Sequence, residues 1–572
     1  MSGPSIKKVS LVKPKSSPLP FRKLAGVCLA LGVMLACSEA PIDGSEDGGL
    51  DGGETGGAGP GAGGSGSGAG PGGGGFGNPG SGGSGLGPGA GGFGNPGSGG
   101  SGLGPGVGGT GNSPSVGGQS AGGSGPGGTG GAAPVGADGL TDLTAFTPAT
   151  CTITPTVMNA SRIPTVGVAT FTADLPGADR AVIQFGETTQ YSFEAPVDWA
   201  ADGHKTLLLG IPANTDVHYR IAVFSGNSVC VSSDATYKSG PLPNGGPSDV
   251  TLTKGPSTIA PAKGFMLFTS GVTGMGGTWV WIVNKAGRVV WSYQFKTGSI
   301  RGHMSWDGKY MYNRDLGPFN SGNGGSINRV AMDGTGETTV QTIGGNHHDF
   351  TVTPTGIAYI SKEAQGQCDR IYTAGPDGSG GKMLVDLDAV FGKFGNAGGG
   401  GTTGEKCHVN AIHYYSDRKV FTLSDREKDA IAMYSETGEY VASIGKQPSE
   451  PLDHHILAEK TGSDWRVQHG HDWYEENKIV LWSNGSFGGG SSKVLHYTIN
   501  GSNATLDWSF TMVGNSPTLG DATRLKNGNY LLTNSQGGIV YEIDPNQQLI
   551  HSMRGSGGYS THRTSLYGAP DF

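Results

Sequence analysis

The sequence predicts an all-β fold, in which a six-bladed β-propeller over residues 247–572 follows a small immunoglobulin- or fibronectin-III-like β-sandwich over residues 141–240. The main observation is a repeat: an aliphatic strand pattern recurs at steps of 45 to 63 residues, beginning at Phe265, Tyr310, Ile357, Val420, Ile479 and Tyr530. Each copy continues with two more strand patterns around a turn with Gly or Asn, which gives the four-strand unit of a propeller blade. No stretch shows convincing helical periodicity.

The first 37 residues predict a lipoprotein signal peptide. Basic residues precede one short apolar run, Leu24 to Ala36, which is too short to span a membrane. The run ends in MLAC, which is similar to a lipobox, so we expect a lipid on Cys37 and no other membrane contact. Because Ser38 follows instead of Asp, we expect an exported lipoprotein of the cell envelope, at the outer membrane or cell surface. An ordinary secretory signal is the alternative.

Residues 38–140 predict a disordered linker rich in Gly, Ser and Pro. The segment FGNPGSGGSGLGPG occurs twice without change, at 76–89 and 93–106, and no Lys or Arg lies between Lys23 and Arg162. Such a composition cannot bury enough apolar area to offset the entropy of ordering the chain. We therefore expect a flexible tether.

Residues 141–240 contain short alternating runs, among them GVATFTADL, AVIQFGE and VHYRIAVFSG, separated by Pro, Gly and Asn turns. This spacing is typical of a β-sandwich. Two of the six cysteines lie within the first 37 residues. Exported chains pass through oxidising space, and pairing the remaining four with their nearest neighbours predicts the disulfides Cys151–Cys230 and Cys368–Cys407.

Charge and motifs exclude several function classes. The net charge is −8 with a pI of about 6.0, and there is no Lys/Arg stripe, so we expect no nucleic-acid partner. The sequence has no P-loop, no Rossmann fingerprint and no CxxC pair. We therefore expect no nucleotide cofactor and no structural zinc.

Histidines lie 7 to 12 residues before the aliphatic strands, at the start of the strand that would be innermost in each blade. The innermost strands of a propeller line its central channel, so equivalent positions on neighbouring blades converge at one mouth. The sequence therefore predicts a histidine cluster near the axis. Its candidates are His347, His348, His408, His469 and His471, with His303 on the second blade and Asp521 in place of a histidine on the sixth.

Arg426 favours an anion over a metal in this cluster. It ends the second strand of the fourth blade, and a hairpin of that length would bring it beside His408. A guanidinium is always charged, repels metal cations and matches tetrahedral oxyanions through paired hydrogen bonds. These residues predict a site for sulfate or phosphate groups.

The second part of the chain resembles the bacterial arylsulfate sulfotransferases, which are periplasmic six-bladed propellers preceded by a small β-domain. The resemblance covers about residues 150–572. It rests on these motifs in this order: His347-His348-Asp349, His408-Val409-Asn410, Ser424-Asp425-Arg426, and Gln468-His469 followed by Asn484-Gly485.

The resemblance implies a ping-pong reaction between an aryl sulfate donor and a phenolic acceptor, through a sulfohistidine and without a nucleotide sulfate donor. It implies that Gln468-His469 supplies the nucleophile and that His408 and Arg426 bind the sulfate, with His347-His348 supplying the remaining imidazole. A gap of two residues would move the nucleophile to His471. WSNG stands where the family often has FDNG, and the chain has few insertions to define an acceptor pocket.

Two other functions stay open: a non-enzymatic, surface-anchored binding propeller, and a metal oxidoreductase on a multi-histidine axis. An enzyme of this kind could also act as a sulfatase, with water as the acceptor. Outside the cluster, we expect structural roles for His303 and for His413 within its strand, and a surface loop around His454-His455. We expect Trp473 and Phe350 to pack in the core.

Overall fold

The computed structural model describes residues 134–136, 139–271, 278–315, 325–362, 367–394, 406–446, 448–457, 465–485, 491–555 and 557–571. The predicted signal peptide, Cys37 and nearly all of the predicted linker lie outside these residues. The described chain is all-β, apart from the short 3-10 helix η1 (Leu143–Ala145) and the one-turn helix α1 (Asp388–Phe391). Within this part, no helix combines the length and apolar character needed to cross a membrane.

Residues 147–238 form two sheets that share one core. The first has the order β2–β3–β6, with β2 (Ile153–Asn159), β3 (Gly167–Ala173) and β6 (Thr206–Leu208). The second has the order β1–β8–β7–β4–β5, with β9 beside β7, and consists of β1 (Thr147–Pro148), β4 (Arg180–Gly186), β5 (Phe193–Pro196), β7 (Asp216–Ser225), β8 (Ser228–Val231) and β9 (Ala235–Lys238). Apolar residues of both sheets, such as Phe171 and Ile183, lie in the same buried cluster, because alternation along each strand turns one face inward.

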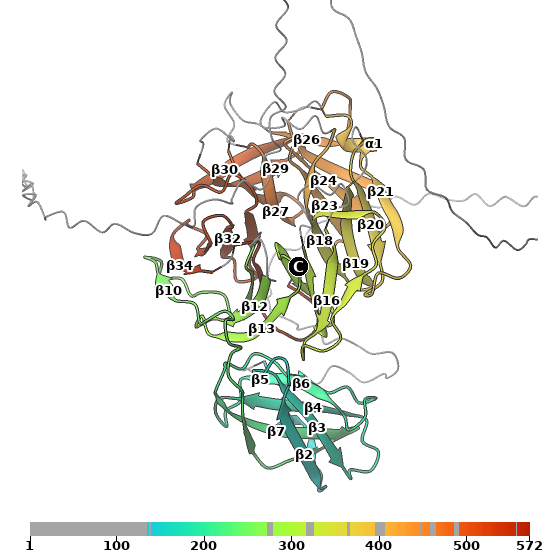
Figure 1. The fold of residues 1–572 in the computed structure, drawn as a ribbon, viewed down its shortest axis with the longest axis vertical. Helices are drawn as coiled ribbons and strands as arrows, with labels where there is room; N and C mark the ends of the chain where they lie inside the picture. Colours follow the sequence, from blue (N-terminus) through green and yellow to red (C-terminus); the bar gives the residue numbers. More distant parts are fainter. Residues whose placement is uncertain are drawn as a thin grey trace, which may run out of the picture. The chain divides into compact units, whose positions relative to one another are not determined.

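The rest of the described chain folds into mainly antiparallel sheets that form a β-propeller (Figure 1). The first sheet has the order β13–β12–β11–β35, with β11 (Phe265–Thr269), β12 (Thr278–Asn284), β13 (Val289–Phe295) and β35 (Thr561–Arg563). The next contains β14 (Arg301–Met304), β15 (Tyr310–Arg314), β16 (Ile327–Ala331) and β17 (Thr338–Val340). It is followed by β18 (Gly345–Thr353), β19 (Gly356–Lys362), β20 (Arg370–Ala374) and β21 (Lys382–Asp386).

A nine-stranded sheet and a five-stranded sheet complete the propeller. The nine strands are β22 (Val409–Tyr415), β23 (Val420–Asp425), β24 (Ala430–Ser435), β25 (Tyr440–Gly445), β26 (His454–Leu457), β27 (Gln468–Glu475), β28 (Lys478–Ser483), β29 (Lys493–Asn500) and β30 (Asn503–Thr511). The five strands are β10 (Leu252–Lys254), β31 (Asp521–Arg524), β32 (Tyr530–Asn534), β33 (Ile539–Ile543) and β34 (Leu549–Arg554).

Each aliphatic pattern of the sequence repeat becomes the second strand from the inner edge of a four-strand group, namely β11, β15, β19, β23, β28 and β32. These strands begin within one residue of the predicted positions. They read as continuous apolar runs because both of their faces are covered; in β19, all residues except the last are buried. The repeat therefore locates the sheets correctly along the sequence.

Strands from opposite ends of this region complete the first and last sheets. The carboxyl-terminal strand β35 pairs with β11 of the first sheet, and β10, which precedes that sheet in sequence, pairs with β34 of the last. Both pairings join the two ends of this region through backbone hydrogen bonds between strands. The sequence analysis did not identify either short strand.

The expectation of a surface loop at His454-His455 is wrong. These residues begin β26, which pairs in parallel with β25 on one side and β30 on the other, and so joins two four-strand groups into the nine-stranded sheet. His454 is buried, and its two ring nitrogens contact the Ser443 hydroxyl at 2.8 Å and the Lys446 carbonyl at 2.9 Å. Two exposed strand edges are thereby covered, which the four residues of β26 do not reveal in the sequence.

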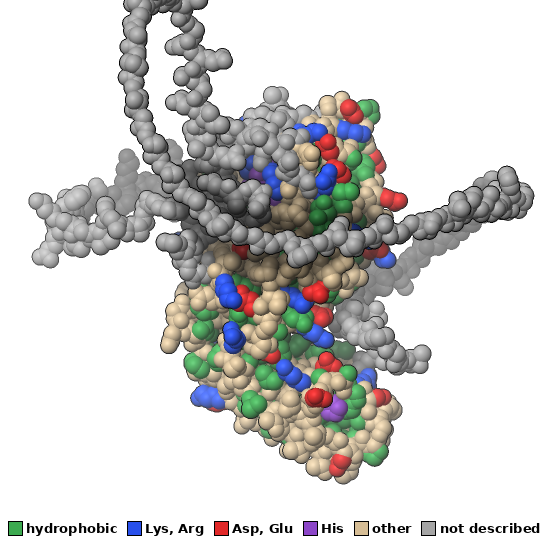
Figure 2. Space-filling view, turned by 45° about the vertical axis from the view of Figure 1, so that its right-hand side comes forward, with side chains coloured by type: hydrophobic (Ala, Val, Ile, Leu, Met, Phe, Trp, Pro, Cys, Tyr) green, Lys and Arg blue, Asp and Glu red, His purple; other side chains and the backbone are tan. Residues whose placement is uncertain are grey.

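Both predicted disulfides are confirmed, since Cys151 bonds to Cys230 and Cys368 bonds to Cys407. Trp473 and Phe350 lie in buried apolar clusters, as expected. On the face shown in Figure 2, Lys/Arg and Asp/Glu side chains are interspersed and form no continuous basic area.

Candidate active site

The candidate residues lie where the innermost strands begin. His347 and His348 are near the start of β18, His408 immediately precedes β22, and His469 is the second residue of β27. β18 contacts β22, and β22 contacts β27, so these starting points come together although they are far apart in sequence. Arg426 follows β23, and its backbone N–H donates to the His408 carbonyl at 3.0 Å, as the predicted hairpin requires.

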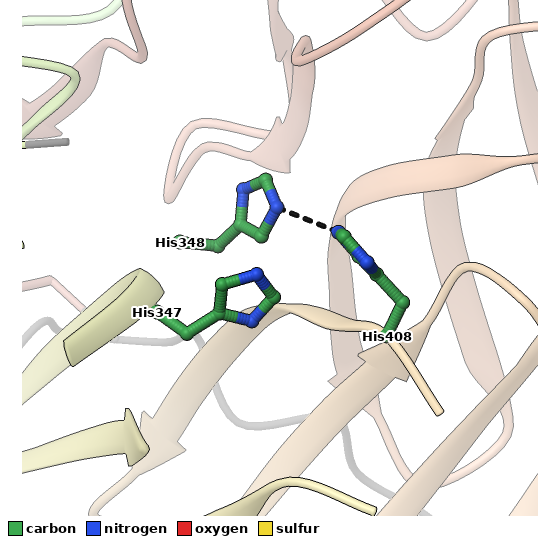
Figure 3. Close-up of side chains that lie close together, drawn as sticks. All are labelled: His347, His348 and His408. Carbon is green, nitrogen blue, oxygen red and sulfur yellow. Dashed lines mark hydrogen bonds between the residues drawn. The ribbon is translucent and has the colours of Figure 1, made fainter. Parts of the chain in front are cut away.

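Three imidazoles form a compact group, which we call the histidine triad: His347, His348 and His408 (Figure 3). Their ring centroids lie 4.3 to 4.7 Å apart. The Nε2 atoms of His348 and His408 are joined by a hydrogen bond of 2.7 Å. His348 and His408 are buried, whereas His347 is partly exposed.

Arg426 determines where the protons of the triad lie. Its Nη2 contacts His408 Nδ1 at 3.1 Å, and because a guanidinium only donates, that nitrogen must accept. The His408 proton is then on Nε2, which donates to His348 Nε2. The His348 proton is consequently on Nδ1, a buried atom with no hydrogen-bond partner among the described residues. The chain of bonds from Arg426 thus ends in an unused N–H donor.

His469 is held in place through contacts of the preceding residue, Gln468, and through its own contact with Asn484. The backbone of the preceding Gln468 accepts from the Asn410 side chain at 2.7 Å, and the Gln468 side chain donates to the Asp425 carbonyl at 2.7 Å. His469 Nδ1 lies 2.6 Å from Asn484 Oδ1, while its Nε2 is buried without a partner in the described chain. The His469 ring lies 6.1 Å from that of His348, so it adjoins the triad.

His471 lies apart from these groups. Its Nε2 contacts the Thr422 hydroxyl at 2.9 Å and its ring packs edge-on against His413 at 5.0 Å, whereas His469 lies beside His348. The residue between the two histidines is Gly470, and Asp521 packs directly against it. A side chain there would clash, because a Cβ would lie 1.9 Å from Asp521 Oδ1. The structure therefore brings His347, His348, His408, His469 and Arg426 together and places His471 elsewhere.

Burial keeps the imidazoles neutral. It lowers the pKa values of His348 and His408 well below the ordinary range, with neighbouring cationic and imidazole groups acting in the same direction. Burial, followed by the positive charge of Arg426, lowers the pKa of His469 to about 3. Burial also lowers the pKa of His347, while Asp369 opposes this shift from 3.6 Å. Neutral imidazoles at pH 7 have lone pairs available for bonding.

Backbone strain gathers at this site. His348 itself has φ +53°, Val467, two residues before His469, has φ +51°, and Leu519, whose carbonyl contacts Asn484, has φ +60°. Branched and bulky residues rarely adopt this conformation, which costs on the order of 1–3 kcal/mol per residue. Such strain persists where surrounding contacts enforce it, and it is frequent at functional sites.

The triad could offer three nitrogen ligands to a metal, since suitable atoms lie within 4.8 Å of one another. The hydrogen bond between His348 and His408, however, already uses one nitrogen of each ring. Arg426 places a permanent positive charge beside the other ring nitrogen of His408, Nδ1. An anion gains from both Arg426 and the free N–H of His348, so the residues present fit an oxyanion better than a cation.

Sequence reasoning missed a buried ionic group beside the site. Arg301 bonds to Asp349 with distances of 2.8 and 3.1 Å and to Asp521 at 2.8 Å, so it joins β14, β18 and β31. It also missed Glu427, which accepts two hydrogen bonds from Arg426 at 2.9 and 3.1 Å. Arg301 begins the innermost strand of its sheet, RGHM, two positions before His303. This position at the start of an innermost strand could have identified it in the sequence. His303 in the same strand packs its ring against Phe350 at 5.1 Å.

A cleft of about 850 Å³ lies elsewhere, lined by residues that include Trp279, Trp281, Tyr541 and Arg554. None of the candidate site residues lines it. Its volume is suitable for a small ligand, but its side chains include none of the imidazoles described above. The candidate active site and this cleft are therefore at different places in the molecule.

No protein-family model and no curated protein matches this chain. Among solved structures, it is similar to TolB from Acinetobacter baumannii, at 11% identity over 62% of this chain and 80% of that chain, with a TM-score of 0.33. It is also similar to a streptogramin B lyase, at 15% identity over 53% of this chain and 87% of that chain, with a TM-score of 0.31. A catalytically inactive virginiamycin B lyase from Staphylococcus aureus is 14% identical over 53% of this chain and 88% of that chain, with a TM-score of 0.31. These values are too low to assign a family, so a function has to be inferred from the side chains.

Proposed function

We propose that this protein is an aryl sulfotransferase, which transfers sulfuryl groups through a sulfohistidine. We propose further that it is an exported lipoprotein, in which a six-bladed propeller follows an immunoglobulin-like sandwich along the sequence. One observation carries the proposal. His469 presents a buried Nε2 with no partner among the described residues, next to a triad that ends in an unused N–H donor. A lone pair beside a set of donors is what covalent transfer of an anionic group requires.

In the first half-reaction, the lone pair of His469 Nε2 attacks the sulfur of an aryl sulfate. An N–S bond forms, the bond between sulfur and the aryl oxygen breaks, and a phenolate leaves with that electron pair. The His469 ring becomes cationic while it carries the sulfuryl group. The acceptor of its Nδ1 proton, Asn484 Oδ1 at 2.6 Å, stabilises this added charge.

Arg426 and the triad would bind the sulfuryl oxygens. His348 Nδ1–H is a donor with no other use, and it is fixed in place by the bonds from Arg426 through His408. Preorganised donors of this kind stabilise charge as it develops and need no rearrangement during the reaction. His347, the most exposed member of the triad and supported by Asp369, is the group best placed to exchange a proton with a phenol.

In the second half-reaction, the oxygen of an acceptor phenol attacks the same sulfur. The N–S bond breaks, its electron pair returns to His469, and the acceptor proton leaves through a neighbouring base. The enzyme regains its starting state, so no cofactor is consumed. Water in place of the phenol would give a sulfatase.

The test uses purified, oxidised protein with 4-nitrophenyl sulfate, with and without phenol. We expect phenol-dependent release of nitrophenolate and formation of phenyl sulfate. His469→Asn should abolish both, while His471→Asn, whose site contacts Thr422 and His413, serves as the matched control and should retain activity. Release that survives His469→Asn but is lost in His471→Asn would show that the wrong histidine has been assigned.

Two results would favour the alternative functions. Stoichiometric iron, copper or zinc in the purified protein, removed by a chelator with loss of activity, would favour metal chemistry at the triad. Folded protein that releases no phenol from a panel of aryl sulfates would favour a binding propeller. Both measurements use the same preparation as the transfer assay.

A further inference from the structure

We infer that Asn484 is a positioning residue, which fixes the proton of His469 on Nδ1 so that the Nε2 lone pair is available to sulfur; this inference rests on the function proposed above. The observation behind it is a pair of contacts on opposite sides of the Asn484 amide. One side faces His469, and the other faces a turn of the following sheet.

The orientation of the Asn484 amide follows from its neighbours. Its Nδ2 group lies 2.5 Å from the Ser516 carbonyl and 2.7 Å from the Leu519 carbonyl. Carbonyl oxygens only accept, so the NH₂ group must face them and Oδ1 must face His469. Oδ1 is likewise an acceptor, and at 2.6 Å it requires a proton on His469 Nδ1. A neutral imidazole has one N–H, so Nε2 keeps its lone pair.

The turn that holds Asn484 is itself firmly fixed. The Ser516 backbone N–H donates to the Ser492 hydroxyl at 2.9 Å, and the Ser516 hydroxyl donates to the Thr518 carbonyl at 2.8 Å. Leu519 has φ +60°, and the next residue must be glycine because a Cβ on Gly520 would lie 2.3 Å from the indole nitrogen of Trp482. Surrounding contacts thus impose a conformation that leucine disfavours. That conformation directs the Leu519 carbonyl at Asn484.

The charged and titratable groups around His469 leave Asn484 as the orienting partner. Arg426, from the loop after β23, is a cation that opposes protonation of the ring. His348, on β18, lies 6.1 Å away between ring centroids. His408, which precedes β22, uses its nitrogens on Arg426 and His348. Val467 offers its carbonyl to the same Nδ1, but only at 3.4 Å.

The first test leaves Asn484 unchanged and needs no substrate. Protein labelled with ¹⁵N-histidine is studied by long-range ¹H–¹⁵N correlation at pH 7, with His469→Asn used to assign its signals. We expect a neutral ring with the proton on Nδ1. A His469 ring protonated on Nε2, or on both nitrogens, overturns the inference whether or not the protein transfers sulfuryl groups.

The second test follows the rate in two variants of Asn484. Asn484→Leu removes the acceptor, and we expect a loss in kcat of about 10²-fold with little change in KM. Asn484→Asp keeps an acceptor and adds a negative charge, which favours the imidazolium. We therefore expect activity to be restored at high pH and the acidic limb of the rate profile to move to higher pH. Asn328→Leu, at a buried asparagine of β16, is the control and should leave the rate unchanged.

The outcomes of the two tests separate two possible errors. A folded Asn484→Leu variant with wild-type kcat and pH profile overturns the role of Asn484. Wild-type protein that transfers no sulfuryl group overturns the proposed reaction, while the NMR measurement still decides the tautomer. If Asn484→Leu does not fold, the NMR result on wild-type protein decides the inference.

Discussion

Replacement of Arg301 by methionine should destabilise the protein strongly at neutral pH. Arg301 is fully buried and makes three hydrogen bonds of 2.8 to 3.1 Å to Asp349 and Asp521. Burial already raises the pKa values of both carboxyl groups, and Arg301 opposes this shift. Without it, two buried carboxylates face each other with only backbone N–H donors left. Breaking a buried ion pair by removing one partner costs about 3–5 kcal/mol.

The pH dependence of this loss has a definite sign. In the variant, the folded-state pKa values of Asp349 and Asp521 rise above the unfolded value of about 3.9, so the folded variant binds more protons than the unfolded chain. Its stability relative to wild type therefore falls as the pH rises through that range. Protonation limits the penalty per carboxylate to about 4 kcal/mol at pH 7 and about 1.5 kcal/mol at pH 5, at about 1.4 kcal/mol per pKa unit. The difference between variant and wild type should thus shrink by about 1 kcal/mol or more at pH 5.

The assay is urea unfolding followed by tryptophan fluorescence at both pH values. Arg370→Met is the matched control, because Arg370 pairs with Asp386 at 3.3 Å with both side chains partly exposed, and such pairs contribute about 0–1 kcal/mol. Adding Asp349→Asn and Asp521→Asn to Arg301→Met should recover most of the loss, since neutral amides need no cation. A loss below about 1 kcal/mol at pH 7, or an equal loss at pH 5, would refute the reasoning.

Three further predictions concern the site and the fold. Arg426→Met should lower kcat for aryl sulfates by about 10²–10³-fold. Arg426→Lys should recover little activity, because an ammonium lacks the planar arrangement of donors with which the guanidinium contacts both His408 and Glu427. Steady-state kinetics would measure both effects, with circular dichroism to check that the variants fold. Protonation of His469 and His413 should remove stability between about pH 6.5 and pH 3, because both have folded pKa values of about 3 and the unfolded chain binds their protons first; wild type should therefore lose more stability on acidification than His413→Asn in urea titrations, and equal losses would contradict this. Reduction of the two disulfides, whose partners lie 79 and 39 residues apart, should cost about 2–5 kcal/mol each, and an unchanged melting temperature in reductant would be the opposing result.

The order of strands could be predicted from the sequence because it depends on local patterns. The aliphatic strands are continuous apolar runs, and they are covered on both faces wherever they lie in the ring, as β19 shows. Register alone then placed His347, His348, His408 and His469 at the starts of innermost strands. Both disulfide pairings followed from nearest neighbours within each predicted domain.

Contacts between distant segments could not be predicted in this way. A surface loop was expected where β26 lies, because so short a segment does not show that β25 and β30 flank it in the fold. β10 and β35 are short, and only ring closure gives them partners. The Arg301 group is similar, since its two carboxylates come from strands far along the chain.

The sequence by itself determined that the chain is a repeat of β-strands with histidines in register and a neighbouring arginine. The tertiary structure decided which histidines meet and where their protons lie. His469 and His471 are two positions apart, and strand alternation gives residues i and i+2 the same face, so the alternation of the strand does not distinguish them. A shift of register in β27 between Gln468 and His471 does so. It directs the His469 ring to Asn484 and the triad and the His471 ring to Thr422, because hydrogen-bond partners outside β27 fix each ring.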